Sequence, residues 1–395
     1  MASIEYRPLL TIDQLVLRPG TGPTENAPNT ANPDNPEFNL DISIHHGLDF
    51  IAPTPWVVSN METTVETPEQ AIAFAQYGAI PVIHQFMPIE QRVEIARALS
   101  EVVIDKEKLN LPWAATKADG RPLFIMAVGY RDAVTHAKAL INAGAPGIRL
   151  DSANGYTPGF RSKVADIAKW RQEQEDQIKE IQDSAQGIAQ LWAGNVATGD
   201  GVMRLAEAGA DTVLIGIGSG TGCGTAKFIR VHMAQASALD ECALAAKQYG
   251  VGIIADGGVR EPGFGGIALA FANRGVMMGS TFAATKESAA PKRSFDDCHQ
   301  AEYYGSASEE ARFRRAQKYP NHYTYDDSDP PEGFNGWIPV RGRVKDVIAN
   351  FNRTLMEQLY YVGVNNLADF RKYAVLHVLS TEAQREVDKG FINNQ

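Results

Sequence analysis

A glycine-rich loop that carries a thiol is the segment of this sequence best suited to covalent chemistry. Residues 216–225 read GIGSGTGCGT and follow the apolar run DTVLI. Glycines let backbone N–H groups converge on an anion, and Cys223 is a nucleophile when its thiol is ionised. A glycine turn or a single buried cysteine is more often structural. The position directly after an apolar strand favours a functional loop.

Two further glycine-bearing segments also follow apolar runs. Asp256-Gly257-Gly258 comes after GIIA, and Gly279-Ser280 comes after VMM and leads into a predicted helix. In a parallel barrel the carboxyl ends of all strands lie on one face, and loops after the last strands often bind phosphate. The three loops therefore predict a phosphate-bearing ligand beside the thiol.

The elements that would position these loops alternate regularly. Strand-like runs are expected at 56–59, 80–84, 123–128, 147–150, 190–193, 212–215, 252–255 and 275–278. Helical patterns follow them at 68–77, 88–103, 133–143, 159–184, 199–208, 235–249 and 265–273. This order predicts an α/β fold, a (β/α)8 TIM barrel, within one catalytic domain over 1–395. A doubly wound sheet is the alternative, but no Gly-x-Gly-x-x-Gly follows the first strand.

The composition of the chain argues against some classes of binding partner and some kinds of site. The formal charge of −10 opposes non-specific binding to nucleic acid or anionic membrane. Three scattered cysteines suggest neither a disulfide framework nor a zinc site, and no long apolar run or leader is present, so we expect a cytoplasmic protein.

Segment 20–39 is predicted to be a surface loop, and segment 297–333 a flap over the active site.

The loop sequences resemble one family. AGNVATGDGVMRLAEAGADTVLIGIGSGTGCGT, IIADGGVR and GVMMGSTFAAT are similar to the corresponding loops of the IMP dehydrogenase/GMP reductase family. The similarity continues from LTIDQLVLRPG through LDSANG to PEGFNGWIPVRGRVKDVIANF, so it covers most of the chain. The resemblance implies an oxidoreductase for a purine nucleoside monophosphate, with NAD or NADPH, assembled as a homotetramer. The stretch between the helix at 88–103 and the next strand is too short for the regulatory CBS modules of most dehydrogenases.

The same resemblance implies roles for individual residues. Cys223 would attack C2 of the purine ring while hydride passes to or from nicotinamide, and Thr225 is a candidate for water activation. Asp256 would bind the ribose hydroxyls. The nucleotide-binding set would comprise Ser59, Met61, Thr221, Asp256, Gly258, Gly279, Ser280, Tyr303, Gly305 and Glu332. Asp151, Ser152 and Asn195 would lie at the nicotinamide, and the carbonyls of Gly218, Gly220 and Cys223 correspond to a potassium site.

The two branches of the family differ in how they use the flap. Dehydrogenases activate water with an Arg-Tyr pair, and this chain has Lys318-Tyr319 at the same spacing before Pro331-Glu332-Gly333. Reductases use a glutamate in a YYGMSSE-type segment, where Glu309 of YYGSASEEA stands. The length of the flap favours oxidation of IMP to XMP with NAD, and Glu309 keeps NADPH-dependent reduction of GMP as the alternative.

Local departures from the family pattern leave other functions open. The stretch IRVHMAQ brings Arg230 and His232 near the predicted site, and GVREPGF follows Asp256. These changes are compatible with a paralogue that acts on another purine nucleotide, or with a non-catalytic nucleotide sensor. Apart from the resemblance, Asp151 is a strand-end residue and Asn195 a turn residue.

Overall fold

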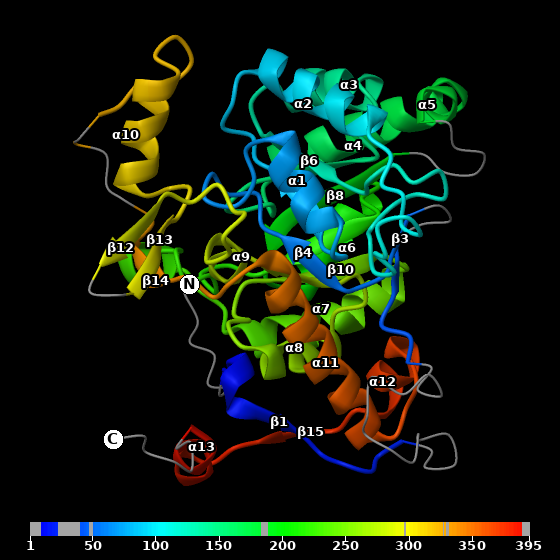
Figure 1. The fold of residues 1–395 in the computed structure, drawn as a ribbon, viewed down its shortest axis with the longest axis vertical. Coiled ribbons are helices and arrows are strands. Elements are labelled where there is room, and N and C mark those ends of the chain that lie inside the picture. Colours follow the sequence, from blue (N-terminus) through cyan, green and yellow to red (C-terminus); the bar gives the residue numbers. More distant parts are fainter. Residues whose placement is uncertain are drawn as a thin grey trace.

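The computed structural model describes residues 9–22, 40–46, 50–182, 189–295, 298–326, 328 and 332–388. Its centre is a closed parallel barrel with neighbours in the order β10, β11, β4, β5, β6, β7, β8, β9 (Figure 1). The strands are β4 Trp56–Val58, β5 Ile80–Ile83, β6 Ile125–Gly129, β7 Gly147–Asp151, β8 Gln190–Val196, β9 Thr212–Ile215, β10 Gly252–Asp256 and β11 Val276–Met278. Each strand falls on a predicted run. Closure of the sheet confirms the TIM barrel and excludes the doubly wound alternative.

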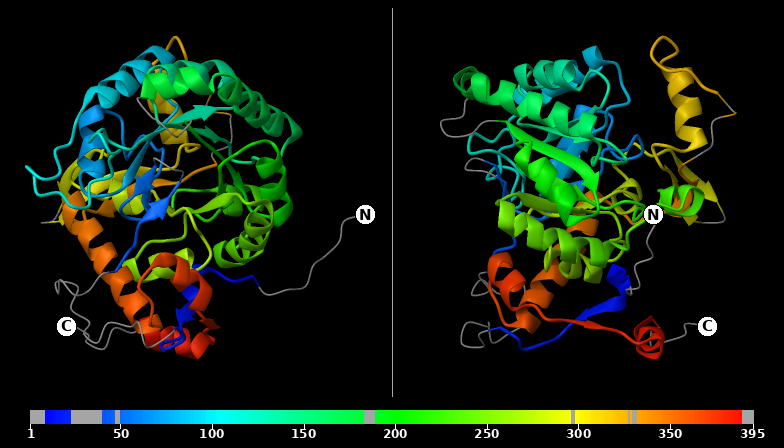
Figure 2. Two further views of the ribbon diagram at one scale, coloured as in Figure 1. Left: turned by 90° about the vertical axis from the view of Figure 1, so that its right-hand side faces the viewer. Right: turned by 180° about the vertical axis from the view of Figure 1, so that it is seen from behind.

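Helices surround the barrel, as the view along it in Figure 2 shows. They are α1 Pro68–Ala75, α2 Ile89–Glu101, α3 Ala133–Asn142, α4 Pro158–Glu173, α5 Glu175–Gln182, α6 Gly199–Glu207, α7 Gln235–Tyr249 and α8 Pro262–Leu269. Thr67, Thr157 and Thr198 cap α1, α4 and α6 by accepting a hydrogen bond from a first-turn amide. The prediction of one helix over 159–184 was wrong, because Gln174 leaves the helical conformation between α4 and α5.

The inside of the barrel is filled by alternate residues of its strands, since successive side chains point to opposite faces. Val57, Ile125, Trp192, Leu214, Ile254 and Met277 belong to one buried cluster. The hairpin of β2 Ile44–His45 and β3 Ile51–Ala52 adds Phe50 and Ala52 to that cluster. His46 stacks on Trp192 with ring centroids 5.1 Å apart. The hairpin thus closes the end opposite the glycine loops, and the other end stays open.

The predicted flap is a folded unit that projects from the open end of the barrel (Figure 1). After the short helix α9 Ser280–Ala283, the strands β12 Lys292–Phe295, β13 Cys298–Tyr304 and β14 Asn335–Pro339 form an antiparallel sheet. Helix α10 Glu309–Lys318 lies between β13 and β14 in the chain. Within 297–333, residues 297, 327 and 329–331 lie outside the described part of the chain.

The remaining segments pack beneath the barrel in Figure 1. Helix α11 Val344–Val362 lies against α8. The chain continues with α12 Leu367–Tyr373, β15 Leu376–Val378 and α13 Thr381–Asp388. Strand β15 pairs antiparallel with β1 Leu15–Leu17, which directly follows the short helix η1 Ile12–Gln14 in the chain. Most of the predicted 20–39 loop, residues 23–39, is outside the described residues. No described helix is long and apolar enough to cross a membrane.

Candidate functional site

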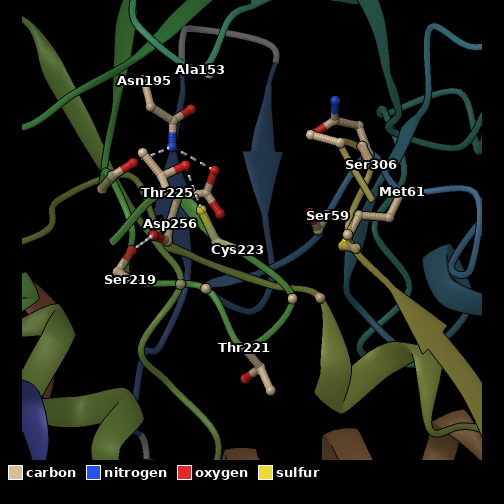
Figure 3. Close-up of a pocket in the computed structure, with 18 of the residues that line it drawn as sticks. Ser59, Met61, Ala153, Asn195, Ser219, Thr221, Cys223, Thr225, Asp256 and Ser306 are labelled. Carbon is tan, nitrogen blue, oxygen red and sulfur yellow. Dashed lines mark hydrogen bonds between the residues drawn. The ribbon is translucent and has the colours of Figure 1, made fainter. Parts of the chain in front are cut away.

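A cavity of about 700 Å³ opens where the barrel strands end. This volume lies within the range of roughly 300–1,000 Å³ of small-molecule sites. Predicted residues that line it are Ser59, Met61, Asp151, Ser152, Asn195, Gly218, Gly220, Thr221, Cys223, Thr225, Asp256, Gly258, Gly279, Ser280, Tyr303, Gly305 and Glu332. In Figure 3, Ser59, Met61 and Ser306 face Asn195, Ser219 and Asp256 across it.

The thiol loop connects β9 to the one-turn π-helix η3 Thr225–Ile229. The Cys223 Sγ lies 3.2 Å from the Thr225 Oγ1 and is partly exposed in the cavity. The segment around Glu332 crosses this loop: the Gly224 amide donates to the Glu332 carbonyl at 2.7 Å, and the Phe334 amide to the Gly222 carbonyl at 3.0 Å. A Cβ on Gly224 would lie 2.7 Å from the Glu332 backbone. The glycines beside Cys223 therefore permit this close crossing.

A network of amide and carboxylate groups around one arginine forms the floor of the cavity. The Arg149 Nη2 lies 2.9 Å from the Asp151 Oδ1 and 3.1 Å from the Asp256 Oδ2. The Asn195 Nδ2 donates to the same Asp256 oxygen at 2.9 Å. Asn60 and Gln85 donate to the other Asp151 oxygen, at 2.9 and 3.1 Å. These contacts fix two carboxylates at the ends of β7 and β10.

Burial dominates the electrostatics of this floor. It raises the pKa of Asp256 above the usual value of an aspartate, and the Arg149 guanidinium and the Asn195 hydrogen bond oppose that shift. Burial also raises the pKa of Tyr303. Tyr303 is therefore a neutral hydroxyl that can donate a hydrogen bond.

Glycines and hydroxyls surround another part of the cavity. Gly257 and Gly258 have φ of +87° and +84°, a conformation that other residues rarely adopt. The Thr221 Oγ1 lies 3.4 Å from the Ser280 Oγ. The Tyr303 hydroxyl donates to the Met61 Sδ at 3.5 Å. This part offers neutral hydroxyls and backbone amides, which are groups that bind a phosphate.

Comparison with known proteins identifies the family. Residues 26–389 match the model of the IMP dehydrogenase / GMP reductase domain. The chain belongs to this family. It is similar to the inosine-5'-monophosphate dehydrogenases of Staphylococcus epidermidis, with 33% identity over 343 residues, and Staphylococcus saprophyticus, with 29% over 346. Each alignment covers 86% of this chain and 64% of the relative, so the chain spans a little under two thirds of their length.

The residues predicted to separate the two branches of the IMP dehydrogenase/GMP reductase family do not line the cavity. The Lys318 Nζ binds the Glu66 carboxylate at 3.0 Å, and the Tyr319 hydroxyl donates to the Gln91 Oε1 at 3.0 Å. Glu309 accepts a hydrogen bond from the Tyr325 hydroxyl at 2.8 Å. All three belong to α10 or its ends. Their catalytic roles stay predictions.

The predicted potassium carbonyls lie on the thiol loop. The Gly220 carbonyl accepts the Cys223 amide at 3.0 Å, which leaves one lone pair for an ion. His232 reaches the same loop from outside the cavity, with its Nδ1 3.1 Å from the Ile217 carbonyl. Among the described residues no group of three or more His, Cys, Asp and Glu side chains could hold a metal. Backbone carbonyls fit a weakly held monovalent ion, and that site stays a prediction.

Several charged and amide side chains of the cavity were not predicted from the sequence. They are Asn60, Gln85, Arg149, Arg260, Arg312 and Arg315. One feature of the sequence indicates Arg149: it is a lone cation inside the apolar strand GIRL. Its alternation with Asp151 places both side chains on the inner face of the barrel. Arg312 and Arg315 come from α10, whose position over the cavity depends on tertiary packing.

Proposed function

We propose that this protein is a nicotinamide-dependent oxidoreductase of purine nucleoside monophosphates, and that it oxidises IMP to XMP with NAD. The observation that carries the proposal is the partly exposed Cys223 thiol, beside the Thr225 hydroxyl, in a cavity of suitable size. The names of the relatives support the dehydrogenase branch. Family membership alone supports only an oxidoreductase.

In the proposed reaction the Cys223 sulfur acts first as a nucleophile and then as a leaving group. The Cys223 Sγ, as thiolate, would add to C2 of the purine and form a C–S bond, and the C2 hydrogen would leave with its electron pair to the nicotinamide, the hydride acceptor. Water would then attack C2 and give up a proton to the activating group, and the C–S bond would break with its electron pair returning to sulfur, so that the thiolate is restored and an oxygen stands on C2. Thr225 lies close enough to the Cys223 Sγ, at 3.2 Å, to exchange a proton with it. Lys318 and Tyr319 remain the proposed groups for water activation, and they would require α10 to move.

The nucleotide would lie across the cavity with its phosphate at the glycine loops. Thr221, Gly258, Gly279, Ser280, Tyr303 and Gly305 would bind the phosphate, Ser59 and Met61 would pack beside it, and Asp256 would accept the ribose hydroxyls. Glu332 would accept the N1–H of a 6-oxopurine, which a 6-aminopurine does not have. This set predicts selection of hypoxanthine or guanine nucleotides over adenine nucleotides.

The nicotinamide would occupy the side of the cavity at the end of β7. When bound, it supplies the hydride acceptor. Asp151, Ser152 and Asn195 line this side, and Gln85 and Asn60 hold Asp151 in place. An environment of amides and a carboxylate fits a carboxamide-bearing cationic ring. These residues would orient the ring against C2 and exclude water from the transfer.

Absorbance of reduced nicotinamide tests the proposal directly. A rise with IMP plus NAD is expected, and Cys223→Ala should lower the rate by at least about 10³-fold because the covalent step is lost. Calorimetry should still detect IMP binding to this variant, since sulfur supplies little ground-state binding. Retained turnover in Cys223→Ala would overturn the mechanism. Binding without turnover in the wild type would favour another purine nucleotide or a sensor.

Reductive deamination of GMP with NADPH is the second candidate. Its support is that Glu309 follows the cavity-lining residues Ser306 and Ala307 closely in the chain, whereas Lys318 ends α10. Ammonia release from GMP, abolished by Glu309→Gln, would establish this reaction. No ammonia from GMP in the wild type would exclude it.

We also propose a single catalytic unit without a regulatory nucleotide-binding module. The connection between α2 and β6 supports this: it runs through turns, with one short bridge between Thr116 and Pro122. The family resemblance places the regulatory insertion at this connection. Activity that does not respond to adenine or guanine nucleotides outside the active site is therefore expected.

A further inference from the structure

Arg149 is a buried cation in the middle of the barrel wall. Its side chain is 3% exposed, and it lies on the inner face of β7, two residues before Asp151. The adjoining cluster inside the barrel, with Trp192 and Met277, is apolar. A buried arginine in such a place requires acceptors, because an unpaired charge there is strongly destabilising.

Its acceptors come from several barrel strands. The Nη2 lies 2.9 Å from the Asn195 Oδ1 on β8, 2.9 Å from the Asp151 Oδ1 on β7 and 3.1 Å from the Asp256 Oδ2 on β10. The Nη1 donates to the Asn60 Oδ1 after β4. The planar guanidinium holds these groups in a fixed geometry that a lysine ammonium does not reproduce. One side chain therefore sets the relative positions of four polar groups in the cavity floor.

We propose that Arg149 is a positioning residue that keeps the Asp256 carboxylate an acceptor for the ribose hydroxyls of the nucleotide. The inference rests on the proposed function, because the ribose role of Asp256 belongs to it. Arg149 and Asn195 occupy the Asp256 Oδ2. Among the described residues no hydrogen bond engages the Oδ1, so that oxygen is left to accept from the sugar. A protonated Asp256 would donate instead and would lose the paired ribose contact.

Charge explains why the cation is needed. Asp256 is 18% exposed, and Asp151 is bound to the same guanidinium nitrogen. Burial raises the pKa of Asp256, the Asp151 charge raises it further, and Arg149 lowers it. Tyr303, Cys223 and Arg260 are the other titratable groups around this part of the cavity. Without Arg149, two neighbouring carboxylates would compete for one proton, and Asp256 would be protonated to higher pH.

The test compares binding of IMP and 3'-deoxy-IMP by calorimetry between about pH 6 and about pH 9. In the wild type the ribonucleotide should bind about tenfold more tightly at every pH, as expected for hydrogen bonds to a charged acceptor. In Arg149→Gln this preference should fall to within about twofold at low pH and return as the pH rises. Arg149→Lys keeps the positive charge, so its preference should not change with pH.

Arg171→Gln is the matched control. Arg171 is also buried and pairs with an aspartate, Asp211, but it contacts the Ala189 carbonyl at the opposite end of the barrel. This variant should lose stability and keep the wild-type preference. Arg149→Gln with an unchanged preference at all pH values, or with equal weakening of both ligands, would overturn the proposal.

If Arg149→Gln does not fold, the lysine variant decides. In Arg149→Lys, a pH-independent preference that is smaller than that of the wild type would support the proposal, because the ammonium keeps the charge and loses the guanidinium geometry. A preference that collapses at low pH, or one equal to that of the wild type, would overturn it. A wild-type protein that binds neither nucleotide would contradict the proposed function itself. The two failures are therefore distinguishable.

Discussion

At the scale of single residues, close backbone approaches define the site as much as functional groups do. A Cβ on Gly279 would lie 2.8 Å from the Tyr303 hydroxyl and 2.9 Å from the Met61 Sδ. The φ of Gly279 is −94°, which any residue tolerates. The requirement for glycine at this position is therefore steric, and it comes from the cavity.

Gly279→Ala should weaken nucleotide binding with little effect on folding. The methyl group would push Tyr303 or Met61 into the space that we assign to phosphate, and we expect the Kd for IMP to rise about tenfold, the effect of losing one or two polar contacts. Gly263→Ala is the control, because a Cβ there meets nothing within 4 Å. Calorimetry checks both. Equal affinities in the two variants would contradict phosphate binding at this loop.

The residues that the sequence revealed are those whose chemistry is visible in local pattern. Asp256 and Gly279 directly follow apolar runs, and Cys223 lies on the loop after another, so their place on the face where the strands end was predictable. Arg149 was not predicted, because a single charge within a strand does not reveal which strands supply its partners. Its function depends on Asn60, Asn195 and Asp256, which only barrel closure brings together.

At the scale of elements, α10 is attached to the barrel by ion pairs of unequal burial. Arg315 donates to both oxygens of Glu62 at 2.9 and 2.6 Å, and both side chains are less than 10% exposed. The Arg315 guanidinium also lies 3.3 Å from the centre of the Phe86 ring. Lys318 pairs with Glu66, but it is 48% exposed. The Arg315–Glu62 pair should therefore contribute much more than the Lys318–Glu66 pair to the free energy that holds α10 on the barrel.

Arg315→Met should release α10, and Lys318→Met should not. Removing one partner of a buried pair costs about 3–5 kcal/mol, whereas an exposed pair contributes about 0–1 kcal/mol. We expect amide hydrogen exchange in α10 to accelerate by more than about tenfold in Arg315→Met and by only a few-fold in Lys318→Met. Exchange in the barrel strands serves as the internal control. Similar exchange in both variants would show that burial of the Glu62 pair does not hold the helix.

The sequence predicted the barrel elements better than the projecting unit, for a physical reason. Each barrel strand is a short apolar run followed by an amphipathic helix, so its pattern is local. Strand β14 pairs with β13 through contacts distant in sequence, such as Glu302 with Trp337. Their composition is polar and aromatic, without a clean alternation. A flap was therefore predicted, and its folded sheet and helix were not.

At the scale of the whole molecule, the barrel separates a polar, open end from an apolar, closed end. The open end carries Arg149, Asp151 and Asp256, and the closed end is filled by Phe50 and Trp192. His46 lies beside these rings at the closed end. It is 3% exposed, and neither ring nitrogen has a hydrogen-bond partner among the described residues. A neutral, stacked imidazole there acts as an aromatic filler.

This placement makes the stability of the barrel depend on pH. Burial, with the Arg274 charge, lowers the pKa of His46 from 6.5 to about 3. The folded state therefore keeps a neutral ring, while the unfolded chain takes up a proton below about pH 6.5. Stability contributed by this group is complete above that pH and is lost as the pH falls toward 3, by at most about 1.4 kcal/mol per pH unit.

His46→Phe keeps the stacking on Trp192 and removes the titration, so its free energy of unfolding should fall less steeply than that of the wild type between about pH 6 and about pH 4. Urea denaturation at a fixed protein concentration measures this difference. Parallel pH profiles for His46→Phe and the wild type would mean that the closed end admits a charged imidazole, and that its packing does not exclude water.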